Sequence, residues 1–99
     1  MTVETKETGK KLEVKVRGRL DAMTIPDLEK ILNPKLPGLQ ELDFDFERLM
    51  YVSSAGLRLL LAFHKTMAQQ GGRMVIRHIN DIVGDVLEVT WFIDFLNVE

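Results

Sequence analysis

Apolar and charged residues alternate strictly along two stretches of the chain. Apolar side chains occupy positions 12, 14 and 16, and again positions 42, 44 and 46, with charged residues at the positions after each. A period of two is typical of a β-strand with one buried and one solvent-exposed face. Residues 12–17 and 42–47 are therefore predicted to be strands. The acids of the second one, Asp43, Asp45 and Glu47, are assigned to its exposed face rather than to a cation site.

Three further segments favour strands. Residues 3–7 form a weaker partner strand for residues 12–17, with the chain turning back at Gly9. Residues 74–79 contain the apolar run Met74-Val75-Ile76, which indicates burial on both faces, as in an interior strand. Residues 96–98 suit a short edge strand, and residues 91–95 before it a turn, with Trp91 and Phe92 in the core.

The remaining segments have helical spacing, with apolar residues at i, i+3 and i+4. Thr24 is predicted to cap a first helix that Asn33-Pro34 ends. Ser53 and Ser54 suit the start of a second helix, which Gly71-Gly72 ends. Asn80 suits the cap of a third helix, reaching about Thr90. The apolar faces are Ile25, Leu28, Ile31 and Leu32 in the first helix, and Leu57, Leu60, Leu61, His64, Met67 and Ala68 in the second.

The expected element order is therefore β-β-α-β-α-β-α-β. This order predicts a single α/β domain over residues 1–99, with a mixed sheet of four to five strands. The first two strands form an antiparallel hairpin, and right-handed crossovers make the later strands parallel, with the helices packed largely on one face.

Composition and charge narrow the classes of function. The chain has 99 residues, 45% of them hydrophobic, and no cysteine, so we expect a core that needs no disulfide and a cytoplasmic location. The net charge of −2 argues against nucleic-acid binding, and no apolar run is long enough to insert into a membrane. Residues 55–78 carry four basic and no acidic residues, whereas residues 79–99 carry five acids and no base. Two oppositely charged faces would guide protein partners, although accidental clustering on solvated faces explains the pattern equally well.

The common constellations of catalytic residues are not found. Ser54-Ala55-Gly56 is half of a nucleophile elbow, but position 52 is valine and no acid lies between Ser54 and the last histidine, His78. His64 and His78 each lack a second metal ligand at helical or strand spacing. We therefore expect no catalytic residues, no metal site and no cofactor, and hence no enzyme.

One segment carries a family resemblance. The stretch Tyr51-Val52-Ser53-Ser54-Ala55-Gly56-Leu57, followed by Arg58 and three leucines, resembles the signature of STAS-domain anti-sigma factor antagonists. The block Gly18-Arg19-Leu20-Asp21-Ala22, with Thr24, is similar to a second stretch of that family. Many members have Asp and Ser or Thr where this chain has Ser53 and Ala55.

The resemblance implies a bacterial regulator of transcription that switches partners. The unphosphorylated protein would bind an anti-sigma factor with GHKL-type serine kinase activity and thereby free a sigma factor. That partner would phosphorylate Ser54 with its own ATP and magnesium, and the phosphate would end the interaction. A serine phosphatase would reset the switch. The implied partner-binding residues are Asp21, Ser53, Ser54, Gly56, Leu57 and Arg58.

Two other interpretations stay open. The chain could be an unphosphorylated STAS scaffold subunit of a lipid-transport or other ATPase complex, or Ser54 could be a helix-capping residue alone.

Overall fold

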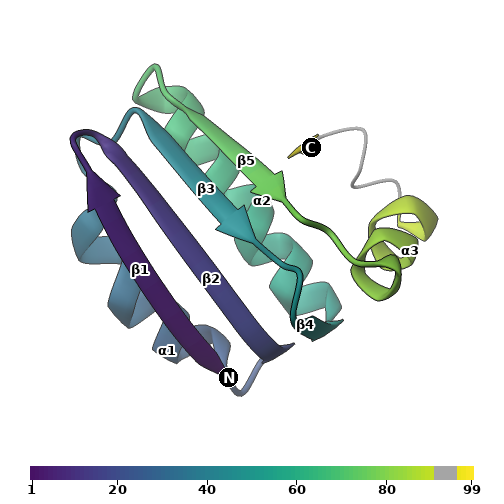
Figure 1. The fold of residues 1–99 in the computed structure, drawn as a ribbon. Coiled ribbons are helices and arrows are strands. Elements are labelled where there is room, and N and C mark those ends of the chain that lie inside the picture. Colours follow the sequence, from purple (N-terminus) through teal and green to yellow (C-terminus); the bar gives the residue numbers. More distant parts are fainter. Residues whose placement is uncertain (91–95) are drawn as a thin grey trace.

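The computed structural model describes residues 1–90 and 96–99, which include six strands and three α-helices (Figure 1). The expected turn at residues 91–95, with Trp91 and Phe92, lies outside the described residues. The strands are β1 (Thr2–Thr8), β2 (Lys11–Leu20), β3 (Glu41–Asp45), β4 (Leu49–Val52), β5 (Arg73–Arg77) and β6 (Asn97–Val98). The helices are α1 (Ile25–Leu32), α2 (Ser54–Gln69) and α3 (Asp81–Val89), with a short 3-10 turn, η1 (Asn33–Lys35), after α1.

The sheet has the predicted mixed topology. Its main order is β1-β2-β3-β5-β6, in which β1 and β2 are antiparallel and the other neighbours are parallel. A two-residue turn joins the hairpin, and Gly9 takes a positive φ of 60° there, which glycine adopts without steric cost. The parallel neighbours are joined by the helices, as the alternation of periods predicted.

Strand β4 was not predicted, so the described chain has one strand more than the expected upper number. It pairs in parallel with the end of β2, beyond the segment of β2 that pairs with β3. Its burial pattern is buried-exposed-exposed-buried, which is not the period of two that reveals a strand in a sequence. The turn between β3 and β4 is held by the side chain of Asn80, which donates hydrogen bonds to the carbonyl oxygens of Phe46 and Leu49 at 3.1 and 2.7 Å.

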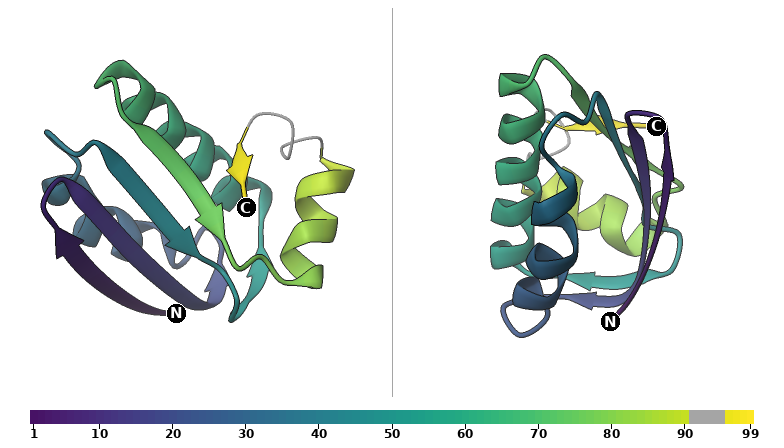
Figure 2. Two further views of the ribbon diagram at one scale, coloured as in Figure 1. Left: turned by 45° about the horizontal axis from the view of Figure 1, so that its top comes forward. Right: turned by 90° about the vertical axis from the view of Figure 1, so that its left-hand side faces the viewer.

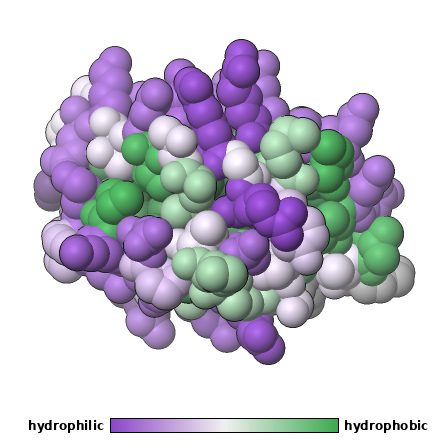
Figure 3. Space-filling view, turned by 90° about the horizontal axis from the view of Figure 1, so that it is seen from below, coloured by the Kyte–Doolittle hydropathy of each residue, from purple (hydrophilic) through white to green (hydrophobic). Residues whose placement is uncertain are grey.

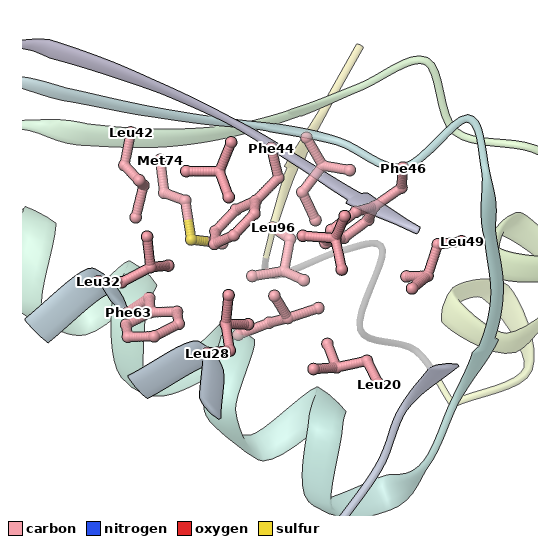
Figure 4. Packing of buried hydrophobic residues seen from close by; sticks show 14 of the residues in the cluster. Leu20, Leu28, Leu32, Leu42, Phe44, Phe46, Leu49, Phe63, Met74 and Leu96 are labelled. Carbon is pink, nitrogen blue, oxygen red and sulfur yellow. The ribbon is translucent and has the colours of Figure 1, made fainter. Parts of the chain in front are cut away.

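Helices α1 and α2 cover one face of the sheet, with the core between the two layers, and α3 packs beside β4 (Figure 2). Leu12, Val14 and Val16 of β2 and Phe44 of β3 point into this layer, as their alternation predicted. Helix α2 contributes Leu57, Leu60, Phe63 and Met67 to the core, so its buried face includes Phe63 while Ala68 is exposed. Figure 4 shows Leu28 and Leu32 of α1 facing Leu42, Phe44 and Met74 of the sheet.

The outer face of the sheet carries charged residues in cross-strand rows. Lys11, Glu41 and Arg73 stand opposite one another on β2, β3 and β5. Asp43, in the next row, lies on the outer face as predicted, but the expectation that it is solvent-exposed was wrong, because the residue is only 4% exposed. Its Oδ2 accepts from Arg77 Nε at 3.0 Å and lies 3.4 Å from Lys11 Nζ, so long basic side chains from both neighbouring strands cover it.

The predicted ends of α2 and α3 are confirmed. The amides of Gly71 and Gly72 bond the carbonyls of Ala68 and Met67, and Gly71 has φ +75°. Asn80 caps α3, since its side-chain oxygen accepts from the amide of Val83 at 2.9 Å.

None of the helices in the described residues combines the length and the apolar character needed to cross a bilayer.

Candidate functional site

The two serines before and at the start of α2 have different environments. Ser53 is the cap: its backbone is extended (φ −84°, ψ 172°) and its Oγ accepts from the amide of Gly56 at 3.2 Å. Ser54 is the first helical residue and is exposed. The hydroxyl of Ser53 is therefore engaged in holding the helix, whereas Ser54 is exposed at the helix N-terminus.

Gly56 allows α2 to approach the end of β2 closely. A Cβ atom at this position would lie 2.8 Å from the carbonyl oxygen of Leu20 and 3.1 Å from side-chain carbons of Leu20 and Val52. The same Leu20 oxygen accepts from the amide of Ser53 at 2.9 Å. This hydrogen bond and the absence of a side chain together seat the first turn of α2, and so Ser54, against the sheet.

A β-bulge next to this helix start turns two consecutive side chains outward. Gly18 pairs with Leu49, but Arg19 pairs with Tyr51, so Met50 is an extra residue on β4. As a result Met50 is 57% and Tyr51 40% exposed, while Leu49 is buried. Figure 3 views the molecule from this end, where hydrophobic patches lie among polar groups.

Asp21 organises the loop between β2 and α1, on the other side of the helix start. Its Oδ1 accepts from the amides of Met23 and Thr24 at 3.0 and 3.2 Å, and its Oδ2 accepts from Arg19 Nε at 3.2 Å. Burial raises the pKa of Asp21, but the hydrogen bonds from Arg19 and the two amides outweigh it and lower the pKa below its ordinary value. Met23, whose amide the carboxylate binds, is 88% exposed.

Thr24 occupies the N-cap position of α1, as predicted, but its side chain makes no cap hydrogen bond there. Its hydroxyl donates to the carbonyl of Arg19 at 2.9 Å and accepts from the amide of Asp21 at 3.0 Å. The hydroxyl thus closes the loop in front of the helix, and the carboxylate of Asp21 takes the amide of Thr24 instead.

Arg19 and Tyr51 form a contact that the sequence did not reveal. The Arg19 guanidinium carbon lies 4.2 Å above the centre of the Tyr51 ring while its Nε bonds Asp21. Tyr51 was recognised as the aromatic residue of a motif, but its pairing with Arg19 depends on β4. The contact links the loop after β2 with the strand before α2, so both sides of the site are fixed together.

The structure leaves four of the predicted site residues at least partly exposed and buries two. Asp21 is partly buried at the loop, Ser53 is half-buried, and Ser54 and Arg58 are exposed on the first turns of α2. Gly56 is buried against Leu20, and Leu57 is 3% exposed within the core. Gly56 and Leu57 therefore hold the helix in place, and little of either can touch a partner in this conformation.

The outer face of the sheet carries a groove that does not include Ser54. One groove of about 300 Å³ lies on the outer sheet face, between Glu13, Asp43, Arg77 and His78. Within the described part of the chain, no three histidine, cysteine or acidic residues are grouped to hold a metal ion.

Comparison with known proteins gives one consistent result. The family model described as "Mlab, STAS domain" matches residues 3–95. The anti-sigma-B factor antagonist of Staphylococcus aureus is 32% identical over 99 residues, which is 99% of this chain and 92% of that protein.

Solved structures share the fold at low identity. An anti-sigma factor antagonist from Mycobacterium paratuberculosis superposes with a TM-score of 0.85 at 18% identity, over 98% of this chain and 83% of the other. The anti-sigma factor antagonist SpoIIAA in its unphosphorylated form gives a TM-score of 0.84 at 15% identity, over 99% and 88%. The Bacillus cell fate determinant SpoIIAA in its phosphorylated form gives 0.77 at 15% identity, over 99% and 91%.

Proposed function

This chain belongs to the STAS domain family, with anti-sigma factor antagonists as relatives, and from that premise we propose that it is a phosphorylation-controlled anti-sigma factor antagonist in the bacterial cytoplasm. Its partner is an anti-sigma factor with GHKL-type serine kinase activity. Binding of the unmodified protein releases a sigma factor, and phosphorylation of Ser54 ends the binding until a serine phosphatase removes the phosphate.

The observation that carries this proposal is the different engagement of Ser53 and Ser54. A kinase must reach a hydroxyl that can leave its own hydrogen bonds without unfolding the acceptor. Ser53 Oγ accepts the cap hydrogen bond from Gly56, so withdrawing it would weaken the helix start. Ser54 is exposed at the first helical position, which supports it as the acceptor.

The surroundings of Ser54 support a protein-docking surface. Met23, Met50 and Tyr51 are exposed apolar or aromatic groups held on a loop and a bulge that are themselves fixed. Methionine and tyrosine side chains gain free energy when a partner covers them, while Arg19 and Arg58 at the surface provide charge for specificity. Asp21 orders this surface by fixing Arg19 and the amide of Met23.

A phosphate on Ser54 would alter this surface without disturbing the fold. It carries about −1.5 to −2 charges at neutral pH. Negative charge at a helix N-terminus is favourable by about 0.3–1 kcal/mol, so α2 tolerates it. A docked partner would have to desolvate that dianion, and burying a dianion without a partner charge costs roughly several kcal/mol.

In this proposal the chain supplies only the acceptor. The Ser54 hydroxyl oxygen attacks the γ-phosphorus of the kinase's ATP, ADP leaves, and the hydroxyl proton passes to a base on the kinase. The ATP and its magnesium ion belong to the partner, and no cofactor is assigned to this chain.

The test is to recover the partner from native cells with the tagged protein, identify it by mass spectrometry, and incubate the two with ATP. We expect one phosphate, mapped to Ser54, and a Ser54→Ala variant that binds but is not labelled. Ser53→Ala is the matched control and should still be labelled. A label on Ser53 or a threonine would show that the motif register is wrong. A transport ATPase as partner, with no phosphate transfer, would instead establish the scaffold interpretation.

A further inference from the structure

Arg58 is placed to meet any charge that is added to Ser54. Both residues are exposed and lie four positions apart within the regular helix α2. Residues at this spacing share one side of a helix, with Cβ atoms roughly 5–6 Å apart. The order also matters, because an acidic group four residues before a basic one has the favoured orientation with respect to the helix dipole.

Arg58 has no part in the ion pairs of the described residues, whereas Arg19 does. The ion pairs engage six basic side chains: Lys11, Arg17, Arg19, Lys35, Arg73 and Arg77. Arg19 already bonds Asp21 and stacks on Tyr51. The first turn of α2 contains no acidic residue, and residues 55–78 contain none at all. Of Arg19 and Arg58, only Arg58 can therefore accept a new anion without giving up a partner among the described residues.

We propose that Arg58 binds the phosphate of phospho-Ser54 within the same helix, forming an intramolecular phosphoserine–guanidinium pair. The inference rests on the proposed function, since it describes the modified state of the same site. Arginine suits this role because its fork of N–H donors matches two phosphate oxygens at once. The phosphate replaces the carboxylate that the first turn of α2 lacks.

This pairing gives phosphorylation two effects on the docking surface. It adds negative charge at Ser54, and it draws the Arg58 cation toward the phosphate, away from any acidic group on a partner. The same arginine thus serves docking in the unmodified protein and holds the phosphate in the modified one. The pair also neutralises part of the new charge within the protein, so the phosphorylated form stays folded.

The experiment uses phosphoserine incorporated at position 54 during translation, so that it needs no kinase. The second pKa of the phosphate, about 6 in an unperturbed phosphoserine, is read by 31P NMR titration. We expect it to lie lower in the otherwise unchanged protein and to rise by roughly half a unit in Arg58→Gln, with Arg58→Lys in between. The difference should shrink as salt is added, because exposed pairs are screened.

Two matched variants make the result specific. Lys65→Gln removes an exposed cation of the same helix that lies about 16 Å along the axis from Ser54, at 1.5 Å per residue, and should leave the titration unchanged. Arg19→Gln tests the competing arginine and should also have little effect. An Arg58→Gln titration equal to that of Lys65→Gln, or a larger shift for Arg19→Gln, would overturn the inference. Failure of a kinase to label Ser54 would refute the proposed function but leave this result standing.

Discussion

Replacing Gly56 by alanine should destabilise the protein, although alanine is the better helix former. The added Cβ would lie 2.8 Å from the Leu20 carbonyl oxygen, closer than such atoms approach in folded proteins. That oxygen cannot move away freely, because it also accepts the hydrogen bond from the amide of Ser53. Helix α2 must therefore shift outward at the turn that carries Ser54.

The size of the effect follows from two opposing contributions. Alanine in place of glycine in a helix contributes about 1 kcal/mol of stability. Overpacking by one methyl group costs about 1–3 kcal/mol, and the upper part of this range applies because a backbone atom and two side-chain carbons are all too close. We expect a net loss of about 2 kcal/mol, which lowers the Tm of a domain of this size by roughly 8–16 °C.

Gly84 of α3 provides the matched control. Among the described residues a Cβ there meets no atom within 4 Å, so Gly84→Ala should gain helix propensity and stabilise the protein by up to about 1 kcal/mol. Urea unfolding followed by circular dichroism measures both variants against the parent. If Gly56→Ala is as stable as the parent or more stable, the close seat of α2 on β2 is not as described.

Two other changes test the site and the sheet. Ser53→Ala should lower the free energy of unfolding by about 1 kcal/mol through loss of the cap hydrogen bond, whereas Ser54→Ala should change it by less than about 0.5 kcal/mol. Equal effects of the two substitutions in urea unfolding would contradict the assignment of Ser53 as the cap. The hydrogen bond from Arg73 outweighs burial and lowers the pKa of Glu41 below its ordinary value of 4.5. The ionised carboxylate therefore contributes its full share to the free energy of unfolding above pH 4.5, and this share is lost as the pH falls through the lowered pKa. The stability difference between the parent and Glu41→Gln should therefore shrink below about pH 4.5, and a difference independent of pH would refute the role of this pair.

Periodicity predicted most of the fold because most elements bury one regular face. The run Met74-Val75-Ile76 and the cap at Asn80 came out as predicted, since each is determined by neighbouring residues in the chain. Strand β4 escaped prediction because the bulge at Met50 places two exposed residues in succession. The burial of Asp43 depends on Lys11 and Arg77, which come from other strands and are invisible to local pattern.

The candidate site was predictable as a motif but not as a surface. The motif located Ser54 correctly at the start of a helix. Its buried members, Gly56 and Leu57, could not be distinguished from its exposed ones, because the same spacing serves both packing and docking. The contact between Arg19 and Tyr51 required the pairing of β2 with β4, which is a tertiary fact.

The central claim is that a phosphate on Ser54 blocks a partner without unfolding the chain. The most direct measurement compares the affinity of the recovered kinase partner for the unmodified protein and for the protein with phosphoserine at position 54, with 15N NMR spectra of both forms. We predict binding at least tenfold weaker, about 1.4 kcal/mol, with shift changes confined to residues near Asp21 and at 53–58. Equal affinity, or loss of dispersion along α2 as far as Gln69, would contradict the account.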